Sequence, residues 1–384
     1  MGEAFRPGHR HRLVGVAAAL LLTAGCAQSP AVATLPRAAG TAACTNAQVL
    51  AGWTLTRLAK QTLVVPVQET DVAAVAPEVA VGIGGVLLFG SSAPATLGSD
   101  LASLKAKAFA GITPFVMSDE EGGAVQRMAN LVGTIPSART MGATMTSTEI
   151  RALARRVGGR MRSAGVTMDL APVLDLDGRA GPNSTDAIGT RSFGTDPHTA
   201  AVDGLAFAGG LREASVIPVA KHFPGIGSAT ANTDVGPAAT PPWSTLQTRD
   251  LLPFRSAVAV AIPAIMVSNA SVPGLTPRPA GMSPAVITGV LRGDLHFHGL
   301  ILTDSLSAGA VSGYGYTVPR AAVTALAAGA DMLLFTASAS AVAGVTRSIV
   351  DAVVAAVAAG TITPIRLQNA VRHILTAKHV DLCA

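Results

Sequence analysis

The chain has 384 residues, a formal net charge of +5 at neutral pH and only 4% aromatic residues. No run rich in Lys and Arg contains interleaved aromatic residues, so the base-stacking surfaces of nucleic-acid-binding proteins are not expected. The length exceeds that of a minimal domain and lies within the range of a single α/β barrel. Composition therefore weakens the case for a nucleic-acid partner.

The first residues have the pattern of an export signal. Three arginines precede an apolar stretch over residues 13–22, which is too short to span a membrane permanently. Ala24-Gly25-Cys26 follows and resembles a bacterial lipobox, in which Cys26 would be lipidated, although Thr23 stands where that motif usually has an aliphatic residue. A plain signal peptide cut nearby is the alternative.

These features predict three segments. Residues 1–26 are expected to be a signal peptide with a lipobox, and residues 27–43, rich in Ala, Pro, Ser and Thr, a flexible tether. Residues 44–384 are expected to form one folded domain. The predicted location is the extracytoplasmic side of the cell membrane, reached by export and held by a lipid anchor only.

Cysteine usage supports the same compartment. The chain has three cysteines, and if Cys26 carries lipid, Cys44 and Cys383 remain as an even pair that brackets the folded region. In a closed barrel the segment before the first strand and the last helix are neighbours, so we expect a Cys44–Cys383 disulfide. Two unrelated buried thiols are the alternative.

Apolar runs that end in polar or Gly-rich loops recur along the chain and predict eight strands. The expected strands are 62–67, 79–89, 113–118, 165–174, 216–220, 262–268, 299–303 and 330–335. Ala-rich amphipathic segments lie between most of them and predict helices, at 99–110, 148–164, 197–213, 248–261 and 283–291, after a first helix that starts near Thr45. This alternation predicts a parallel sheet that closes into a (β/α)₈ barrel. An open doubly wound sheet is the rival, but Pro66-Val67-Gln68-Glu69-Thr70 is not a phosphate-binding Gly-rich turn.

Polar residues follow several of these strands, where a parallel barrel places its chemistry. They are Asp119, Asp175, Lys221 with His222, Asn269 and Asp304, after the third to the seventh strand in that order. A single Asp after a strand is more often a helix cap, but several on one rim predict a site. Pro224, Gly225 and Gly227 break regular structure after His222 and predict a loop that folds over the site.

Four ordered motifs make the chain resemble the bacterial β-N-acetylglucosaminidases of glycoside hydrolase family 3, over residues 60 to 375. They are Ser118-Asp119-Glu120-Glu121-Gly122-Gly123-Ala124-Val125-Gln126-Arg127, Ala171-Pro172-Val173-Leu174-Asp175, Ile188-Gly189-Thr190-Arg191-Ser192-Phe193-Gly194 and Lys221-His222-Phe223-Pro224-Gly225. A fifth, Leu302-Thr303-Asp304-Ser305-Leu306, is similar to the nucleophile segment of that family.

The resemblance implies roles for individual residues. Asp304 matches the carboxylate that attacks the anomeric carbon in a retaining glycosidase. The positions that match residues gripping sugar hydroxyls are Asp119, Arg127, Arg191, Lys221 and His222. Glu120 and Glu121 match no catalytic position, and we interpret them as structural.

The chain departs from the family at the general acid. The family commonly has Asp-Ser-His where this chain has Asn232-Thr233-Asp234, and Ile226 replaces the usual His of the loop. Three hypotheses remain: Asp234 is itself the acid/base, another residue supplies the proton, or the protein binds sugar without cleaving it efficiently. Burial can raise the pKa of a carboxylic acid enough for the first.

The resemblance predicts a retaining exo-β-N-acetylglucosaminidase that removes terminal β-linked GlcNAc, from a glycan or muropeptide of the cell wall. A non-catalytic sugar-binding lipoprotein and a β-N-acetylglucosaminide phosphorylase are the alternatives. No metal or other cofactor is implied, because no His/Cys/Asp cluster has ligand spacing.

Overall fold

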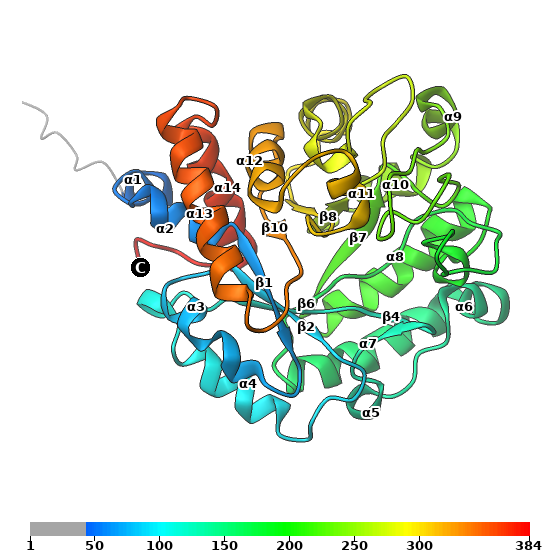
Figure 1. The fold of residues 1–384 in the computed structure, drawn as a ribbon. Helices are drawn as coiled ribbons and strands as arrows, with labels where there is room; N and C mark the ends of the chain where they lie inside the picture. Colours follow the sequence, from blue (N-terminus) through cyan, green and yellow to red (C-terminus); the bar gives the residue numbers. More distant parts are fainter. Residues whose placement is uncertain (1–43) are drawn as a thin grey trace, which may run out of the picture. The chain divides into compact units, whose positions relative to one another are not determined.

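The computed structural model describes residues 44–384. The predicted signal peptide, its Cys26 and the tether lie outside the described residues. The eight-stranded parallel sheet curls into a nearly closed barrel with helices around it, which confirms the predicted fold class (Figure 1). The strands are β1 (Leu63–Gln68), β2 (Gly85–Phe89), β3 (Phe115–Ser118), β6 (Met168–Asp169), β7 (Ile217–Phe223), β8 (Ala264–Val267), β9 (Leu300–Thr303) and β10 (Leu333–Leu334).

The strands follow one another around the barrel in sequence order. Sheet neighbours run β10-β1-β2-β3-β6-β7-β8-β9, and every pairing is parallel. The two ends of the sheet meet where Leu302 bridges Met332 and the Thr303 N–H donates to the Met332 carbonyl over 2.9 Å. All eight strands of this sheet therefore present their carboxyl ends at one rim.

Helices cover the outside of the barrel. The longer ones are α4 (Leu97–Lys105), α7 (Ser147–Ser163), α8 (Pro197–Glu213), α10 (Leu252–Ala259), the π-helix η5 (Ala285–Asp294), α12 (Val318–Ala328), α13 (Val342–Ala358) and α14 (Pro364–Ala377). Shorter helices are α1 (Asn46–Ala51), α2 (Leu55–Gln61), α3 (Ala76–Ala80), α5 (Ala129–Val132), α6 (Ala138–Thr144), α9 (Trp243–Thr248) and α11 (Gly309–Gly313). In residues 44–384 none of the helices has the length and apolarity to cross a membrane.

Alternating side chains of each strand fill two apolar cores. On β1, Val64 points into the barrel, where it packs with Met117, Met168, Leu302 and others. Its neighbours Val65 and Val67 point outward and pack under the helices. The period of two explains why these strands read as continuous apolar runs, since both of their faces are buried.

Three predicted strands are less than half as long as expected. The first part of 79–89 lies partly in α3 and in a turn where Gly82 has a φ of +90°, so β2 begins only at Gly85. In 165–174 the regular strand β6 covers only Met168 and Asp169, although Val173 still forms an isolated bridge with Lys221. The segment 330–335 pairs regularly only at Leu333 and Leu334.

The two ends of the described chain lie together. Helix α1 packs against α14, and a disulfide joins Cys44 to Cys383 with their Cα atoms 5.8 Å apart (Figure 1). Asn46 adds two hydrogen bonds, since its Nδ2 donates to the Val380 carbonyl over 2.9 Å and its Oδ1 accepts from the Leu382 N–H over 2.7 Å. The first helix is thereby tied to the last.

Candidate active site

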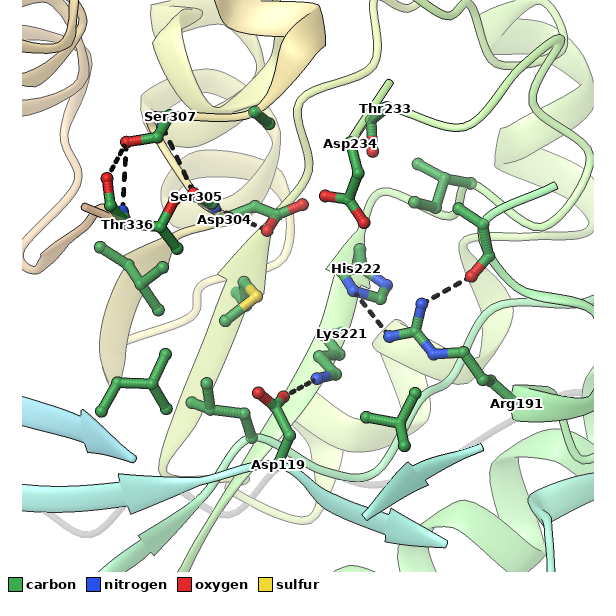
Figure 2. A pocket seen from close by; sticks show the side chains of 18 of the residues that line it. Asp119, Arg191, Lys221, His222, Thr233, Asp234, Asp304, Ser305, Ser307 and Thr336 are labelled. Atoms are coloured by element: carbon green, nitrogen blue, oxygen red, sulfur yellow. Dashed lines mark hydrogen bonds and ion pairs between the residues drawn. The ribbon is translucent and has the colours of Figure 1, made fainter. Parts of the chain in front are cut away.

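A cavity of about 410 Å³ opens at the carboxyl rim of the barrel. Its lining includes the seven residues predicted to act in catalysis or substrate binding, which come from the loops after β3, β6, β7 and β9 and from the end of β7. Figure 2 labels all of them except Arg127. They are Asp119, Arg127, Arg191, Lys221, His222, Asp234 and Asp304. Asp175 and Asn269, also predicted for this rim, do not line the cavity. They contact residues that do, Asp175 through His222 and Asn269 through Ser305.

Strand β7 extends beyond its predicted end at Ala220. It runs to Phe223, so Lys221 and His222 belong to the strand itself and their backbones are held by the barrel wall. Lys221 is 2% exposed, and its Nζ lies 2.7 Å from Asp119 Oδ1 and 2.6 Å from Glu121 Oε1. Burial alone would lower the pKa of this lysine, but the two carboxylates raise it, so Lys221 is a fixed cation at the cavity floor.

Glu121 joins the two cations of the site. Arg191 donates to both of its oxygens, from Nε to Oε2 over 2.7 Å and from Nη2 to Oε1 over 2.8 Å. Burial works to raise the pKa of Glu121, but Arg191 and Lys221 together outweigh it and hold that pKa below its usual range. A bidentate pair of this kind fixes the guanidinium in one plane. The structure thus gives Glu121 a supporting place beneath the cavity.

His222 is oriented by a buried carboxylate. Its Nδ1 lies 2.7 Å from Asp175 Oδ2, and its backbone N–H donates to the same oxygen over 3.1 Å. The other oxygen of Asp175 accepts from the Ile226 N–H over 2.7 Å. Asp175 therefore holds both the imidazole and the start of the loop that carries Asp234, leaving His222 Nε2 toward the cavity, 3.5 Å from Arg191 Nη2.

A short hairpin after β3, absent from the predicted elements, positions Arg127 and Asp119. Its strands are β4 (Glu120–Gly122) and β5 (Val125–Gln126). Glu120 Oε1 accepts from the backbone N–H groups of Arg127 and Met128, each over 2.9 Å, and burial raises the pKa of Glu120 to about 7. Arg127 Nη2 lies 3.8 Å from Asp119 Oδ2. Glu120 thus supports the hairpin that aims Arg127 at the cavity.

Asp304 follows β9 directly, as the sequence indicated. The Ser305 N–H donates to its Oδ1 over 2.6 Å, and Asn269 Nδ2 donates to the Ser305 carbonyl over 2.8 Å, which fixes the turn. Burial raises the pKa of Asp304, and the negative charge of Asp234 raises it further, while His222 and Lys221 oppose the rise. Asp304 is therefore a partly buried carboxylate whose charge depends on its neighbours.

The carboxyl group of Asp234 faces the cavity. In Figure 2 it lies opposite Asp304 and above His222, on the loop after β7. Its backbone is held independently of the side chain, since its N–H donates to Asn232 Oδ1 and its carbonyl accepts from the Gly309 N–H, each over 2.9 Å. Asp234 is exposed at the mouth of the cavity.

The remaining lining residues were missed by sequence reasoning. The inward positions of the strands supply an apolar floor that includes Leu87, Leu170 and Met266, and Phe89 ends β2 at the rim. The period of two within each strand is the signal that identifies such positions. Across the part of the chain that the structure describes, no group of three or more His, Cys, Asp or Glu residues is arranged to hold a metal ion.

Two carboxylates that face each other in a cavity lined with cations, at the carboxyl rim of a single barrel, are what a glycoside hydrolase needs at its active site. The comparisons agree: residues 60–377 match the glycosyl hydrolase family 3 N terminal domain, and the chain belongs to this family.

The most similar relatives include bacterial β-hexosaminidases. The chain is 41% identical over 260 residues to the β-hexosaminidase LpqI of Mycobacterium tuberculosis, an alignment that covers 66% of each, just under two thirds of that relative. It is 33% identical to a β-hexosaminidase of Nitrosomonas eutropha over 66% of the chain and 73% of the relative.

Solved structures match over a larger share of this chain. The structure of M. tuberculosis LpqI has a TM-score of 0.77 and 35% identity, over 88% of this chain and 97% of that one. A family 3 β-N-acetylglucosaminidase from a Paenibacillus strain has a TM-score of 0.78 and 28% identity, over 85% of this chain and 62% of that one.

Proposed function

We propose that the protein is a retaining exo-β-N-acetylglucosaminidase that hydrolyses terminal β-linked GlcNAc. The observation that carries the proposal is the position of Asp304 and Asp234, whose carboxyl groups face each other across one cavity (Figure 2). The family, the β-hexosaminidase relatives and the related β-N-acetylglucosaminidase structure support the substrate class. The inward direction of Asp234 favours an enzyme over a sugar-binding protein without catalysis.

The reaction would proceed in two steps. Asp304 attacks the anomeric carbon while Asp234 protonates the departing glycosidic oxygen, which gives a covalent glycosyl–Asp304 intermediate and a free aglycone. Asp234, now a carboxylate, takes a proton from a water molecule, whose oxygen attacks the same carbon and releases GlcNAc with the original anomeric configuration. Exposure of Asp234 at the cavity mouth suits both the leaving aglycone and the entering water.

The other cavity residues would bind the sugar. Asp119 can accept from sugar hydroxyls, while Lys221 and Arg191, already fixed by Glu121, donate charge-assisted hydrogen bonds. These groups are in place before substrate arrives, so little ordering is required on binding.

The test is product analysis with an aryl β-N-acetylglucosaminide and with a GlcNAc disaccharide, each with and without inorganic phosphate. We expect GlcNAc released first as the β-anomer, observed by proton NMR, and no activity in Asp304→Asn. The α-anomer as first product would refute retention, and GlcNAc 1-phosphate in the phosphate arm would show phosphorolysis. Absence of turnover on both substrates would indicate a binding protein.

The natural substrate and location are part of the same proposal. Peptidoglycan fragments fit an exported enzyme, and the sequence pattern of residues 1–26 supports lipidation at Cys26. Labelled fatty acid should be incorporated into the wild-type protein in its host but not into Cys26→Ala. Equal labelling of both would refute the anchor, and secretion without label in the wild type would indicate a plain signal peptide.

A further inference from the structure

A second cavity, of about 760 Å³, lies at the other rim of the barrel, where strands begin. Its lining includes Phe115 and Ile217, which are the first residues of β3 and β7. Four cationic side chains and one imidazole also line it, and among residues 44–384 no carboxylate does: the basic residues are Lys105, Arg162, Arg212, Lys378 and His379. We call this space the basic cavity.

The four cations lie at the carboxyl ends of helices α4, α7, α8 and α14. Helix carbonyls offset part of their charge. Lys105 Nζ donates to the Gly165 carbonyl over 2.6 Å, and Arg212 Nη1 donates to the Val260 carbonyl over 3.3 Å. Between residues 44 and 384, however, none of the four cations forms an ion pair with a carboxylate. The basic cavity thus retains an excess of positive charge.

Lys378 is the least compensated of these cations. Its Nζ is buried and has no hydrogen-bond partner among the described residues, and it lies 5.1 Å from the centre of the Phe115 ring. Burial lowers the pKa of Lys378 to about 7. An unpaired buried ammonium is unfavourable, so such a group usually has a counter-ion or loses its proton.

We propose that the basic cavity is a binding site for a phosphate-bearing anion. The oxygens of a phosphate group can accept from the Lys105 ammonium group and from the planar guanidiniums of Arg162 and Arg212, which suit bidentate contacts, while the buried Lys378 ammonium adds a positive charge beside them. The volume leaves room for a group attached to the phosphate. The site lies at the rim opposite the sugar cavity and does not depend on the proposed hydrolysis.

Calorimetric titration of the purified full chain with inorganic pyrophosphate at low salt and pH 7 tests the site. We expect one bound anion, and Lys378→Met should weaken its binding about tenfold or more, because the cavity loses a positive charge that water does not screen. Two controls should bind as the wild type: Lys60→Met, a lysine outside the basic cavity, and Arg191→Met, which alters the sugar cavity. Loss of binding only in Arg191→Met would move the anion to the sugar cavity and overturn the proposal.

A second readout separates binding from a structural role. Since the lysine is largely neutral at pH 8 and would be protonated beside an anion, binding at that pH should take up a proton, so that the binding enthalpy varies with the ionisation enthalpy of the buffer. The number of protons taken up, after correction for the ionisation of pyrophosphate itself, should be smaller in Lys378→Met than in the wild type. An unchanged number would show that the lysine is not protonated on binding. If Lys378→Met fails to fold, the double variant Arg162→Gln with Arg212→Gln, at two exposed side chains, provides the same affinity test.

Vesicle sedimentation identifies the source of the phosphate. Pelleting with phosphatidylglycerol vesicles but not with phosphatidylcholine vesicles, lost in Lys378→Met, would assign the site to an anionic lipid headgroup. Binding of pyrophosphate without pelleting would assign it to a small phosphorylated molecule. No binding of either probe, or affinity unchanged in both Lys378→Met and the double variant, would show that these cations only cap helix ends.

Discussion

Removal of the Asp234 carboxyl group should slow hydrolysis of substrates with poor leaving groups much more than hydrolysis of substrates with good ones. The backbone of this residue is held by Asn232 and Gly309 rather than by its own side chain, so Asp234→Ala should leave the loop in place. A general acid contributes roughly 10²–10⁴-fold to rate. That range corresponds to about 2.7–5.5 kcal/mol of transition-state stabilisation.

The assay compares two substrates under the same conditions. Hydrolysis of a GlcNAc disaccharide by Asp234→Ala should fall by about 10²–10⁴-fold, whereas the glycosylation step with an activated aryl glycoside should change by less than about tenfold, because its leaving group scarcely needs a proton. Azide should accelerate the second step by attacking the intermediate without a general base. Asp351→Ala, which removes an exposed carboxylate of α13, is the matched control and should behave as the wild type.

Two results would refute the reasoning. If both substrates lose activity equally and azide has no effect, Asp234 only anchors the loop and the proton comes from another group. If Asp234→Ala equals the wild type on both substrates, the carboxyl group has no catalytic role despite facing the cavity.

Other predictions concern the nucleophile, its support and the disulfide. Asp304→Asn should lower turnover by several orders of magnitude at unchanged melting temperature, and a fluoro-sugar should label Asp304; label on Glu121 would overturn the assignment. Burial, and then the negative charge of Asp234, raise the pKa of Asp304, so activity on an aryl substrate should fall as pH drops through that raised pKa. Asp234→Asn removes the negative charge and should shift this acid limb of the pH profile to lower pH. An unmoved limb would contradict the coupling. Glu121→Gln should raise KM by about tenfold or more, since Arg191 loses a charge-assisted bidentate partner; an unchanged KM would exclude this support role. Thiol titration of unfolded, unreduced protein should find neither Cys44 nor Cys383 reactive, and two reactive thiols would reject the bond. Reduction should lower the unfolding free energy by at most about 6 kcal/mol, because the bridge joins residues 339 positions apart.

The sequence by itself determined the order of strands and helices and the rim on which chemistry would lie. Apolar runs followed by Asp119, Lys221 or Asp304 are local patterns, and a parallel barrel brings the carboxyl ends of all strands together whatever their separation in the chain. For this reason the sequence alone predicts the seven charged or imidazole side chains of the cavity.

Tertiary structure alone decided how these residues act on one another. The contact of Glu121 with Arg191, 70 positions away, and the hold of Asp175 on His222 depend on which side chains meet in space, and neither spacing nor composition reports that. The direction of the Asp234 side chain depends on the fold of an irregular loop, where no helix or strand period tells which way a side chain points. The basic cavity depends on four helix ends that are distant in sequence. Lys378 Nζ has no hydrogen-bond partner within residues 44–384 because of what surrounds it in space, which local sequence does not encode.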